Sequence, residues 1–317
     1  MHLHPRTEIE IGFRAIATLC LLSFAAPLAA KNAVECKLLA PPGRMLRAES
    51  SNEDLGGLRL ACAGPRAAWP DGSRFTLSLR FSVPLHRSSR PRLRMYGSSP
   101  GAQGSEGTVS GGVVTWSGIP FRWAPAGARP AVASVTGLAV NAAQSPPEVT
   151  VVVGVSSAQA TVTVPKPQVA VARVGQGLRA RVAKTAAMRT CAPDEPWTVN
   201  VEVSEGFPAA FGAGNIMLSS DRGTMEGPPT VAEGGLEFRR MDRFTFPRTG
   251  RLMYSVHGAS NGALESVSLP LTLTGNDEGE AGQNIQVDLA YVPRSGTDRR
   301  FVNSATLVVA AYQPCGS

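Results

Sequence analysis

Charged side chains make up only 17% of the 317 residues and aromatic side chains only 6%, and the chain has four histidines. Apolar residues nevertheless reach 43%, a near-normal share that excludes a chain disordered throughout. Beyond residue 30 the sequence has neither the long uncharged apolar run of a membrane-spanning helix nor the apolar stripe of an amphipathic helix. The 33 glycines and 25 prolines also disfavour a helical bundle, because both are poor helix formers. The remaining fold class is a folded protein built mainly from β-strands.

Residues 1–30 have the pattern of a secretory signal peptide. A short polar start ends at Arg14, an apolar run covers residues 15–28, and the small residues Ala29 and Ala30 follow it. The run is shorter than the roughly 20 residues that a membrane span needs. We therefore predict cleavage near Ala30 and an exported protein without a transmembrane segment, in the periplasm, on the cell surface or outside the cell.

Four cysteines follow the expected cleavage site: Cys36, Cys62, Cys191 and Cys315. An even number of cysteines in an exported chain indicates disulfides. Three pairings are possible, and we favour Cys36–Cys62 with Cys191–Cys315 because each pair then lies within one expected domain. Zinc is disfavoured, because the chain has no Cys-x-x-Cys motif and no histidine near these cysteines. No metal and no cofactor is predicted.

Apolar and polar residues alternate along many short segments, as they do in strands with one buried face. Residues 74–83 alternate without a fault. The pattern recurs at residues 149–155, 158–164, 169–174, 199–203, 252–256, 267–273, 285–291 and 306–312. We predict an all-β fold of two antiparallel β-sandwich domains in tandem, residues 31–184 and 185–317. The boundary is placed in the basic, alanine-rich stretch 179–189.

Several motifs follow one another in a specific order: Cys36, the proline pair 41–42, Arg47-Ala48-Glu49, Asp54-Leu55-Gly56-Gly57-Leu58 and Cys62, then Phe121-Arg122, Val140-Asn141-Ala142 and Gly177-Leu178. In this order, over about residues 34–180, the chain resembles an uncharacterised family of exported β-rich proteins from Gram-negative soil bacteria. The C-terminal half is vaguely similar to secreted pilin-type domains, through its last alternating segment. The resemblance implies export and a β architecture, and it implies no functional site.

Catalytic motifs are sparse. His86 and His257 are the two histidines beyond residue 30, whereas nucleophilic triads and many metal sites use histidine. Residues 258–262 match the Gly-x-Ser-x-Gly elbow of hydrolases, but a strand-like segment follows, so we interpret Ser260 as part of a hairpin turn. Glu202 and Glu205 are the kind of carboxylate pair that glycosidases use, although a strand would leave Glu202 on its solvated face. No enzyme is expected.

The densest basic run consists of Arg87, Arg90, Arg92 and Arg94. It is a candidate binding site for a polyanion, with salt-sensitive affinity. The interpretation we favour is a solvated sheet edge, whose positive charge prevents edge-to-edge aggregation.

Trp116 and Trp123 are candidates for stacking on sugar rings, although a tryptophan in a sandwich more often fills the core or its rim. The acidic loop around Asp277 has the oxygen ligands but not the spacing of a calcium loop. We interpret this loop as a solvated turn.

Sparse catalytic chemistry on a disulfide-bonded scaffold leads to three functional hypotheses. The first is an exported, non-catalytic protein with a structural, adhesive or surface-interaction role in the envelope or outside the cell. The second is a carbohydrate- or polyanion-binding module, and the third is a secreted hydrolase. The expected partner is a second copy of the chain, paired through the strand edge at 306–312, or a surface polysaccharide. No specific nucleic-acid partner is expected.

Overall fold

The computed structural model describes residues 33–96, 104–125, 131–192, 194–211, 214–244, 250–258, 263–275, 280–293 and 302–315. Within these ranges the chain forms strands, turns and the short 3-10 helices η2 (Arg66–Ala68), η3 (Ala142–Gln144) and η4 (Asp242–Phe244), but no α-helix. The prediction of an all-β fold is confirmed. The expected signal peptide, Ser260 and Asp277 lie outside the described residues.

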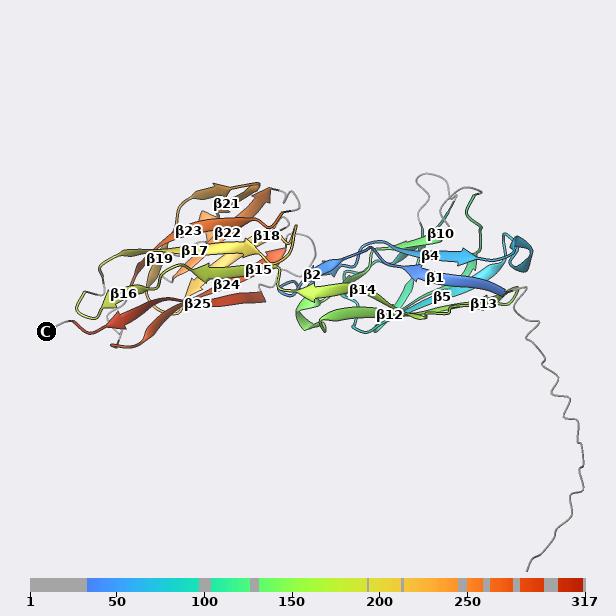
Figure 1. The fold of residues 1–317 in the computed structure, drawn as a ribbon, viewed down its shortest axis with the longest axis horizontal. Coiled ribbons are helices and arrows are strands. Elements are labelled where there is room, and N and C mark those ends of the chain that lie inside the picture. Colours follow the sequence, from blue (N-terminus) through green and yellow to red (C-terminus); the bar gives the residue numbers. More distant parts are fainter. Residues whose placement is uncertain are drawn as a thin grey trace, which may run out of the picture.

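Two β-sandwich units follow one another in the chain and lie end to end along the long axis of the molecule (Figure 1). The first unit contains β1 (Ala33–Leu39), β2 (Met45–Arg47), β3 (Glu53–Asp54), β4 (Leu58–Ala63), β5 (Arg74–Phe81), β6 (Arg92–Met95), β7 (Ser105–Glu106), β8 (Thr108–Ser110), β9 (Val113–Pro120), β10 (Ala131–Thr136), β11 (Ala139–Val140), β12 (Glu148–Ser157), β13 (Thr161–Thr163) and β14 (Gln168–Gly175). The second contains β15 (Leu178–Val182), β16 (Ala186–Arg189), β17 (Trp197–Glu205), β18 (Gly214–Ser220), β19 (Thr224–Glu226), β20 (Thr230–Glu233), β21 (Leu236–Arg240), β22 (Arg251–Gly258), β23 (Ser266–Thr274), β24 (Asn284–Pro293) and β25 (Val302–Gln313).

The first unit is built from two six-stranded sheets whose buried faces share one apolar core. Their strand orders are β13-β1-β4-β10-β6-β7 and β2-β14-β12-β5-β9-β8, and β3 with β11 forms a separate two-stranded sheet. Most neighbours are antiparallel, as expected. Two edge pairs are parallel instead, β1 with β13 and β2 with β14. The strand pattern of the sequence did not distinguish these parallel edges.

The alternation of residues 74–83 becomes the central strand β5. Phe75, Leu77 and Leu79 point into the core, whereas Arg74 and Arg80 are exposed on the other face. Burying each such apolar side chain contributes about 1.5–3 kcal/mol. This transfer of apolar area from water is what holds the two sheets together.

The second unit has a four-stranded sheet, β15-β17-β23-β19, and a seven-stranded sheet, β16-β25-β24-β18-β22-β21-β20, with a core of their own. β17 and β23 pair antiparallel over their full overlap, from Trp197 opposite Leu273 to Ser204 opposite Ser266. The edge strand β16 pairs parallel with β25. β16 pairs with residues 310–313 of β25, so it covers the C-terminal part of the edge at 306–312 that we expected for self-association, and its register does not extend to residues 306–309.

The change from one unit to the next occurs at Gln176 and Gly177, immediately after β14. The next strand, β15, pairs antiparallel with β17, and its first residue Leu178 is buried in the second core. This strand lies N-terminal to the boundary at 184/185 that we expected, yet it belongs to the sheets of the second unit.

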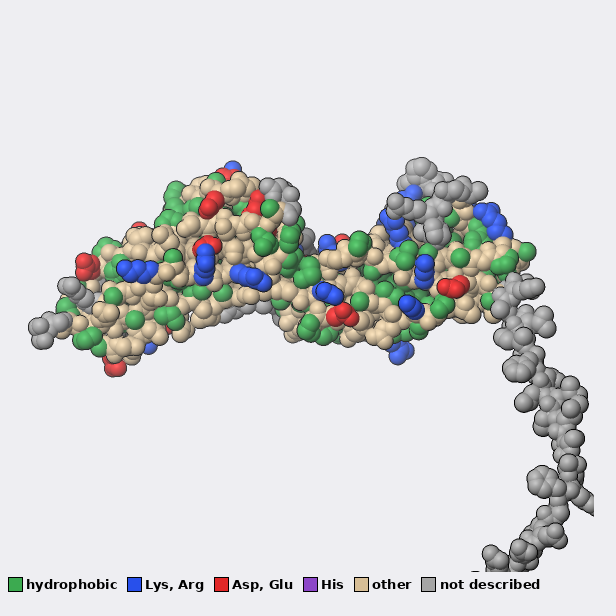
Figure 2. Space-filling model, viewed as in Figure 1, with side chains coloured by type: hydrophobic (Ala, Val, Ile, Leu, Met, Phe, Trp, Pro, Cys, Tyr) green, Lys and Arg blue, Asp and Glu red, His purple; other side chains and the backbone are tan. Residues whose placement is uncertain are grey.

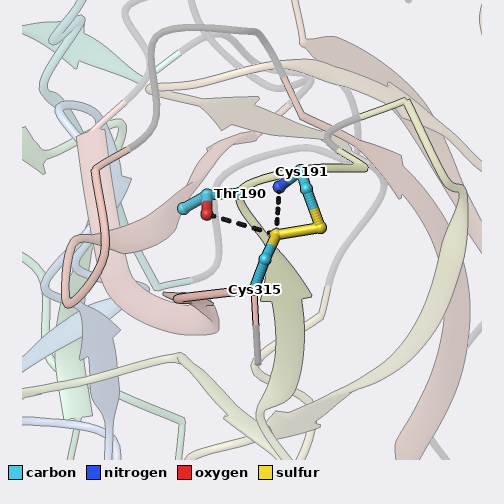
Figure 3. Close-up of a disulfide and its surroundings, with 3 residues drawn as sticks. All are labelled: Thr190, Cys191 and Cys315. Atoms are coloured by element: carbon cyan, nitrogen blue, oxygen red, sulfur yellow. Dashed lines mark hydrogen bonds between the residues drawn. A yellow bond between two sulfur atoms is a disulfide. The ribbon is translucent and has the colours of Figure 1, made fainter. Parts of the chain in front are cut away.

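Both disulfides form with the pairing favoured from the sequence. Cys36 and Cys62 are opposite each other on β1 and β4, with Cα atoms 4.0 Å apart, and both are buried. Cys191 and Cys315 follow the parallel strands β16 and β25, and their Cα atoms are 5.8 Å apart. The amide of Cys191 donates a hydrogen bond to Sγ of Cys315 at 2.7 Å (Figure 3). This disulfide links residues 124 positions apart and ties both ends of the second unit together.

None of the helices in the described part of the chain has the length and apolar character required to cross a membrane.

Candidate functional site

The four arginines of the basic run do not form one cluster. Arg92 and Arg94 lie on β6, where Leu93 and Met95 point into the core and both arginines point to solvent. Arg87 and Arg90 precede β6 and line an open cavity at the edge of the sandwich. The structure therefore divides the predicted polyanion site into a sheet face and a cavity.

The sheet face brings Arg94 near another arginine, which the sequence analysis did not select. Ser134 on β10 is opposite Arg94 on one side and opposite Arg59 of β4 on the other. Adjacent strands are about 4.8 Å apart, so the backbone positions of Arg59 and Arg94 are about 10 Å apart. Arg59 is exposed between the buried Leu58 and Leu60. The alternation of apolar and basic residues at positions 58–60 could have indicated from the sequence that Arg59 lies on the exposed face of a strand.

Lys37 on β1 is exposed on the same solvent face, where its neighbour Leu39 is opposite Arg59. We call this set, Lys37, Arg59, Arg92 and Arg94, the basic face. Two carboxylates accompany it: Glu35 on β1 and Glu106 on β7, which is opposite Arg92. In Figure 2, separate basic side chains are spread over the visible face of the first unit, which is the unit on the right.

The cavity has a volume of about 400 Å³ and lies between the loop 84–91 and the strands β7 and β8. We call it the arginine cavity. Its apolar wall consists of Pro84, Leu85, Pro91 and Val109. His86, Arg87, Arg90 and Glu106 provide its polar groups. The cavity meets the basic face at Glu106, because this residue is the register partner of Arg92.

Backbone and side-chain hydrogen bonds hold the loop 84–91 in place. The amide of His86 donates to the carbonyl of Ala139, and the amide of Arg90 donates to the carbonyl of Gly137. Ser89 Oγ bonds both the carbonyl and the amide of Ala139 at 3.0 Å. Gly137 has a φ of +74°, and a Cβ atom there would lie 2.1 Å from the carbonyl oxygen of Arg90. Only glycine fits this contact, so the cavity wall is formed before any ligand arrives.

The arginines at the site differ in whether their guanidinium groups already form hydrogen bonds within the protein. Arg90 Nη1 donates to the carbonyls of Ser89 and Arg87, at 2.9 and 3.2 Å. The guanidinium groups of Arg87 and Arg92 make no hydrogen bond or ion pair with the described part of the chain. Both remain available to an anionic ligand.

Trp116, a candidate for sugar stacking, instead fills the core, as a tryptophan in a sandwich more often does, because the residue is only 1% exposed. Its indole Nε1 donates to the carbonyl of Ser105 at 3.1 Å. The indole fills the space beside Gly107, where a Cβ atom would lie 2.6 Å away.

Trp123 is half-buried at the opposite end of β9 from the arginine cavity. Its indole donates to the carbonyl of Trp69 at 2.8 Å, and its ring meets Phe121 edge-on. Phe121 in turn stacks on Trp69 with the ring centroids 3.7 Å apart. Trp123 therefore covers the rim of an aromatic core, and the structure does not bring it to the arginines.

The residues considered for hydrolysis do not form a site with one another. Glu202 is ion-paired with Arg181 at 2.7 Å on the outer face of β17. Glu205 is 2% exposed on the opposite face and accepts hydrogen bonds from the amides of Phe211 and Glu265. Three residues of separation on a strand place the two carboxylates on opposite sides.

A serine and a histidine do meet on β22, where Ser255 Oγ lies 2.9 Å from Nε2 of His257. Both residues belong to the second unit, and neither lines the arginine cavity. Within the described ranges, no three His, Cys, Asp or Glu side chains gather closely enough to hold a metal ion.

A buried charged cluster joins the two sandwiches, and of its charged residues the sequence singled out only Arg47 and Glu49, through the resemblance. Arg47 on β2 donates from Nε to Glu53 at 2.7 Å. Its Nη1 donates across the junction to the hydroxyl of Tyr291 at 2.9 Å and to the carbonyl of Ala210 at 3.1 Å. Burial acts to lower the pKa of Arg47, but Tyr291 and Glu53 outweigh it and the pKa is raised. The guanidinium thus stays charged inside the junction.

Glu49 binds the first residues beyond the junction. Its carboxylate accepts hydrogen bonds from the amides of Gly177 at 2.9 Å and Leu178 at 3.1 Å. Burial raises the pKa of Glu49, and these amides and Arg47 partly oppose the shift. Gln176 Nε2 adds a bond to the carbonyl of Ser304 at 2.8 Å. Polar contacts on several elements therefore fix one unit against the other.

No family model and no curated protein matches the chain. Among solved structures, the chain is similar to one described as BspA_C_mut, at 9% identity and a TM-score of 0.39, over 88% of this chain and 98% of that one. It is similar to the B domain of a biofilm associated protein, at 8% identity and a TM-score of 0.27, over 86% and 84%. The collagen adhesin of S. aureus is another match, at 9% identity and a TM-score of 0.21, over 87% and 91%. At these values the likeness carries no functional argument, which must come from the residues of this chain.

Proposed function

We propose that this chain is an exported, non-catalytic protein that acts through its surface, as a structural or adhesive component of the cell envelope or of the exterior. The observation that carries the proposal is the junction: Arg47 and Glu49 fix two disulfide-bonded sandwiches to each other. Enzymes that close over a substrate need a hinge between their domains. A fixed end-to-end pair suits a protein that presents a surface at a set distance.

Export is supported by the signal-like residues 1–30 and by the two disulfides, since disulfides form and persist in oxidising compartments. Disulfides in both units also suit a protein that must stay folded outside the cytosol.

The test has two parts and uses the full chain. The first expresses it in a Gram-negative host, with and without residues 1–30, and follows the protein by fractionation, N-terminal sequencing and non-reducing peptide mapping. Oxidised protein outside the cytoplasm only when residues 1–30 are present supports export. Reduced protein in the cytoplasm in both cases would refute it.

The second part incubates the purified protein with intact cells and, separately, with panels of chromogenic esters and glycosides. Retention on cells without turnover supports the proposal. Turnover that disappears in Ser255→Ala, with folding unchanged, would replace it with hydrolysis at the Ser255–His257 pair.

A further inference from the structure

We propose that the arginine cavity and the basic face together bind a carboxylated polysaccharide, with one acidic sugar unit in the cavity and the following units over Arg92, Arg94 and Arg59. The inference rests on the surface-interaction function proposed above and names its ligand class.

The arginine cavity has the size and the chemistry for one acidic sugar. Pockets for small ligands begin at about 300 Å³, and this one measures about 400 Å³. Leu85 and Val109 offer an apolar wall to the C–H face of a sugar ring. Glu106 is an acceptor for sugar hydroxyls, and the guanidinium of Arg87 pairs with a carboxylate through two parallel hydrogen bonds.

The cavity is also formed in advance. Ser89, the amide of Arg90 and the obligatory Gly137 hold its loop against the strand region around Ala139. A loop that is already ordered does not lose conformational entropy when the ligand binds. Affinity for a weakly anionic sugar can then come from a small number of contacts.

The basic face continues from the cavity in a regular array. Glu106 at the cavity is opposite Arg92, Arg94 is two residues further along β6, and Ser134 separates Arg94 from Arg59. The backbone spacing is about 7 Å along the strand and about 10 Å across the two strand intervals. A polymer whose acid groups recur every one or two sugar units can therefore meet successive guanidinium groups.

The same features disfavour nucleic acid as the ligand. Proteins that bind single strands use exposed aromatic rings as stacking platforms, whereas Trp69, Trp116 and Phe121 are buried in this unit and Tyr96 and Trp123 are only partly exposed. Glu106 at the cavity can accept hydrogen bonds from the hydroxyls of a sugar ring, in which a polysaccharide is richer than DNA.

The experiment measures the affinity of the purified full chain for polygalacturonate, alginate, neutral dextran, dextran sulfate and single-stranded DNA at several salt concentrations. The test variants are Arg87→Ala with Arg92→Ala, and Glu106→Gln. The matched control is Arg80→Ala with Arg173→Ala, which removes the same charge from exposed positions on the other sheet. Thermal unfolding and disulfide mapping verify that each variant is folded.

We expect the carboxylated polymers to bind best, the Arg87/Arg92 variant to bind them roughly tenfold more weakly or worse, and the Arg80/Arg173 control to bind as the wild type does. The Glu106→Gln variant keeps an acceptor oxygen for sugar hydroxyls and loses a negative charge, so it should bind the carboxylated polymers and dextran sulfate at least as tightly as the wild type does. Equal losses in test and control variants, or tighter binding of DNA than of polygalacturonate, would overturn the inference. A protein that is retained on cells but binds none of the polymers would also overturn it, and would leave the proposed function standing.

Discussion

Arg47 in the first sandwich and Tyr291 in the second meet across the junction, with the guanidinium Nη1 2.9 Å from the phenol oxygen and its carbon 5.3 Å from the ring centroid. The residues are 244 positions apart in the chain. Each supplies what the other lacks in the junction: Tyr291 gives the buried cation an acceptor and a π face, and Arg47 gives the buried hydroxyl a donor. This pair, together with the ion pair between Arg47 and Glu53, links the two consecutive sandwich domains through direct side-chain contacts.

We predict that Arg47→Met loosens the junction and destabilises the protein by about 3–5 kcal/mol, because it leaves the buried carboxylate of Glu53 without its partner. Small-angle X-ray scattering measures the loosening as a broader distribution of interatomic distances. Urea unfolding measures the loss of stability.

The matched control for this substitution is Tyr291→Phe, which removes one hydrogen bond at a cost of about 1 kcal/mol and keeps the ring over the guanidinium. Scattering profiles of Arg47→Met that superimpose on those of the wild type would contradict a role in fixing the units.

Glu49 gives the junction a pH dependence. Burial raises its pKa above the ordinary value of 4.5, so the folded state holds this proton more tightly than the unfolded chain does. The protonated Glu49 side chain therefore contributes fully to the unfolding free energy below about pH 4.5. This contribution is lost, and the protein becomes less stable, as the pH rises through the raised pKa of Glu49. In urea titrations from about pH 4 to about pH 8, Glu49→Gln should lose less stability with rising pH than the wild type.

The exposed Glu195 provides the comparison for that experiment. Glu195→Gln should follow the pH dependence of the wild type. If the unfolding free energy of Glu49→Gln fell with rising pH as steeply as that of the wild type and of Glu195→Gln, Glu49 would not be the group responsible for the pH dependence.

The two disulfides should differ in their contribution to stability because they close loops of different length. The separations are 26 residues for Cys36–Cys62 and 124 residues for Cys191–Cys315. The loop-entropy relation gives about 3.5 and about 5 kcal/mol respectively. Calorimetry of the two Cys→Ser double variants should show the larger loss for the second pair, and a reversed order would mean that burial of Cys36 and Cys62 dominates.

Gly137→Ala tests the pre-formed cavity. The added Cβ atom would meet the carbonyl of Arg90 at 2.1 Å and φ is +74°, so the loop 84–91 must move, at a cost of about 1–3 kcal/mol. Gly111→Ala is the control, because Gly111 also lines the cavity with φ +59° but has no atom within 4 Å of the added Cβ. Polygalacturonate affinity should fall in Gly137→Ala and stay near the wild-type value in Gly111→Ala.

The strand content was predictable because alternation is a local property. At residues 74–81 every second side chain is apolar, and a strand is the local conformation that sends all of them to one side. The segment 158–164 shows the limit of this reasoning, since only Thr161–Thr163 pairs, as the short edge strand β13. The disulfide pairing was also predictable, because two compact domains leave one pairing that does not cross between them.

The candidate site was predictable only in part. Arg92 and Arg94 could be placed on one exposed face from their spacing in the sequence. No sequence pattern shows that Arg59 lies near them, because this proximity arises only when β10 pairs with both β4 and β6. Trp116 follows the alternation of β9, but Ser105 and Gly107, which cover its indole, come from β7 of the other sheet and from the residue between β7 and β8.

The amino-acid order by itself determined which residues are extended, which side chains turn away from water, and how the cysteines pair, because each depends on a period of two or on closeness within a domain. Only the tertiary structure decided that Arg59 lies near Arg94, that Ser105 and Gly107 cover Trp116, and that Arg47 meets Tyr291. These relationships depend on which strands become neighbours. The choice of neighbours is made by the packing of the whole core, in which residues far apart in the chain compete for the same buried surface.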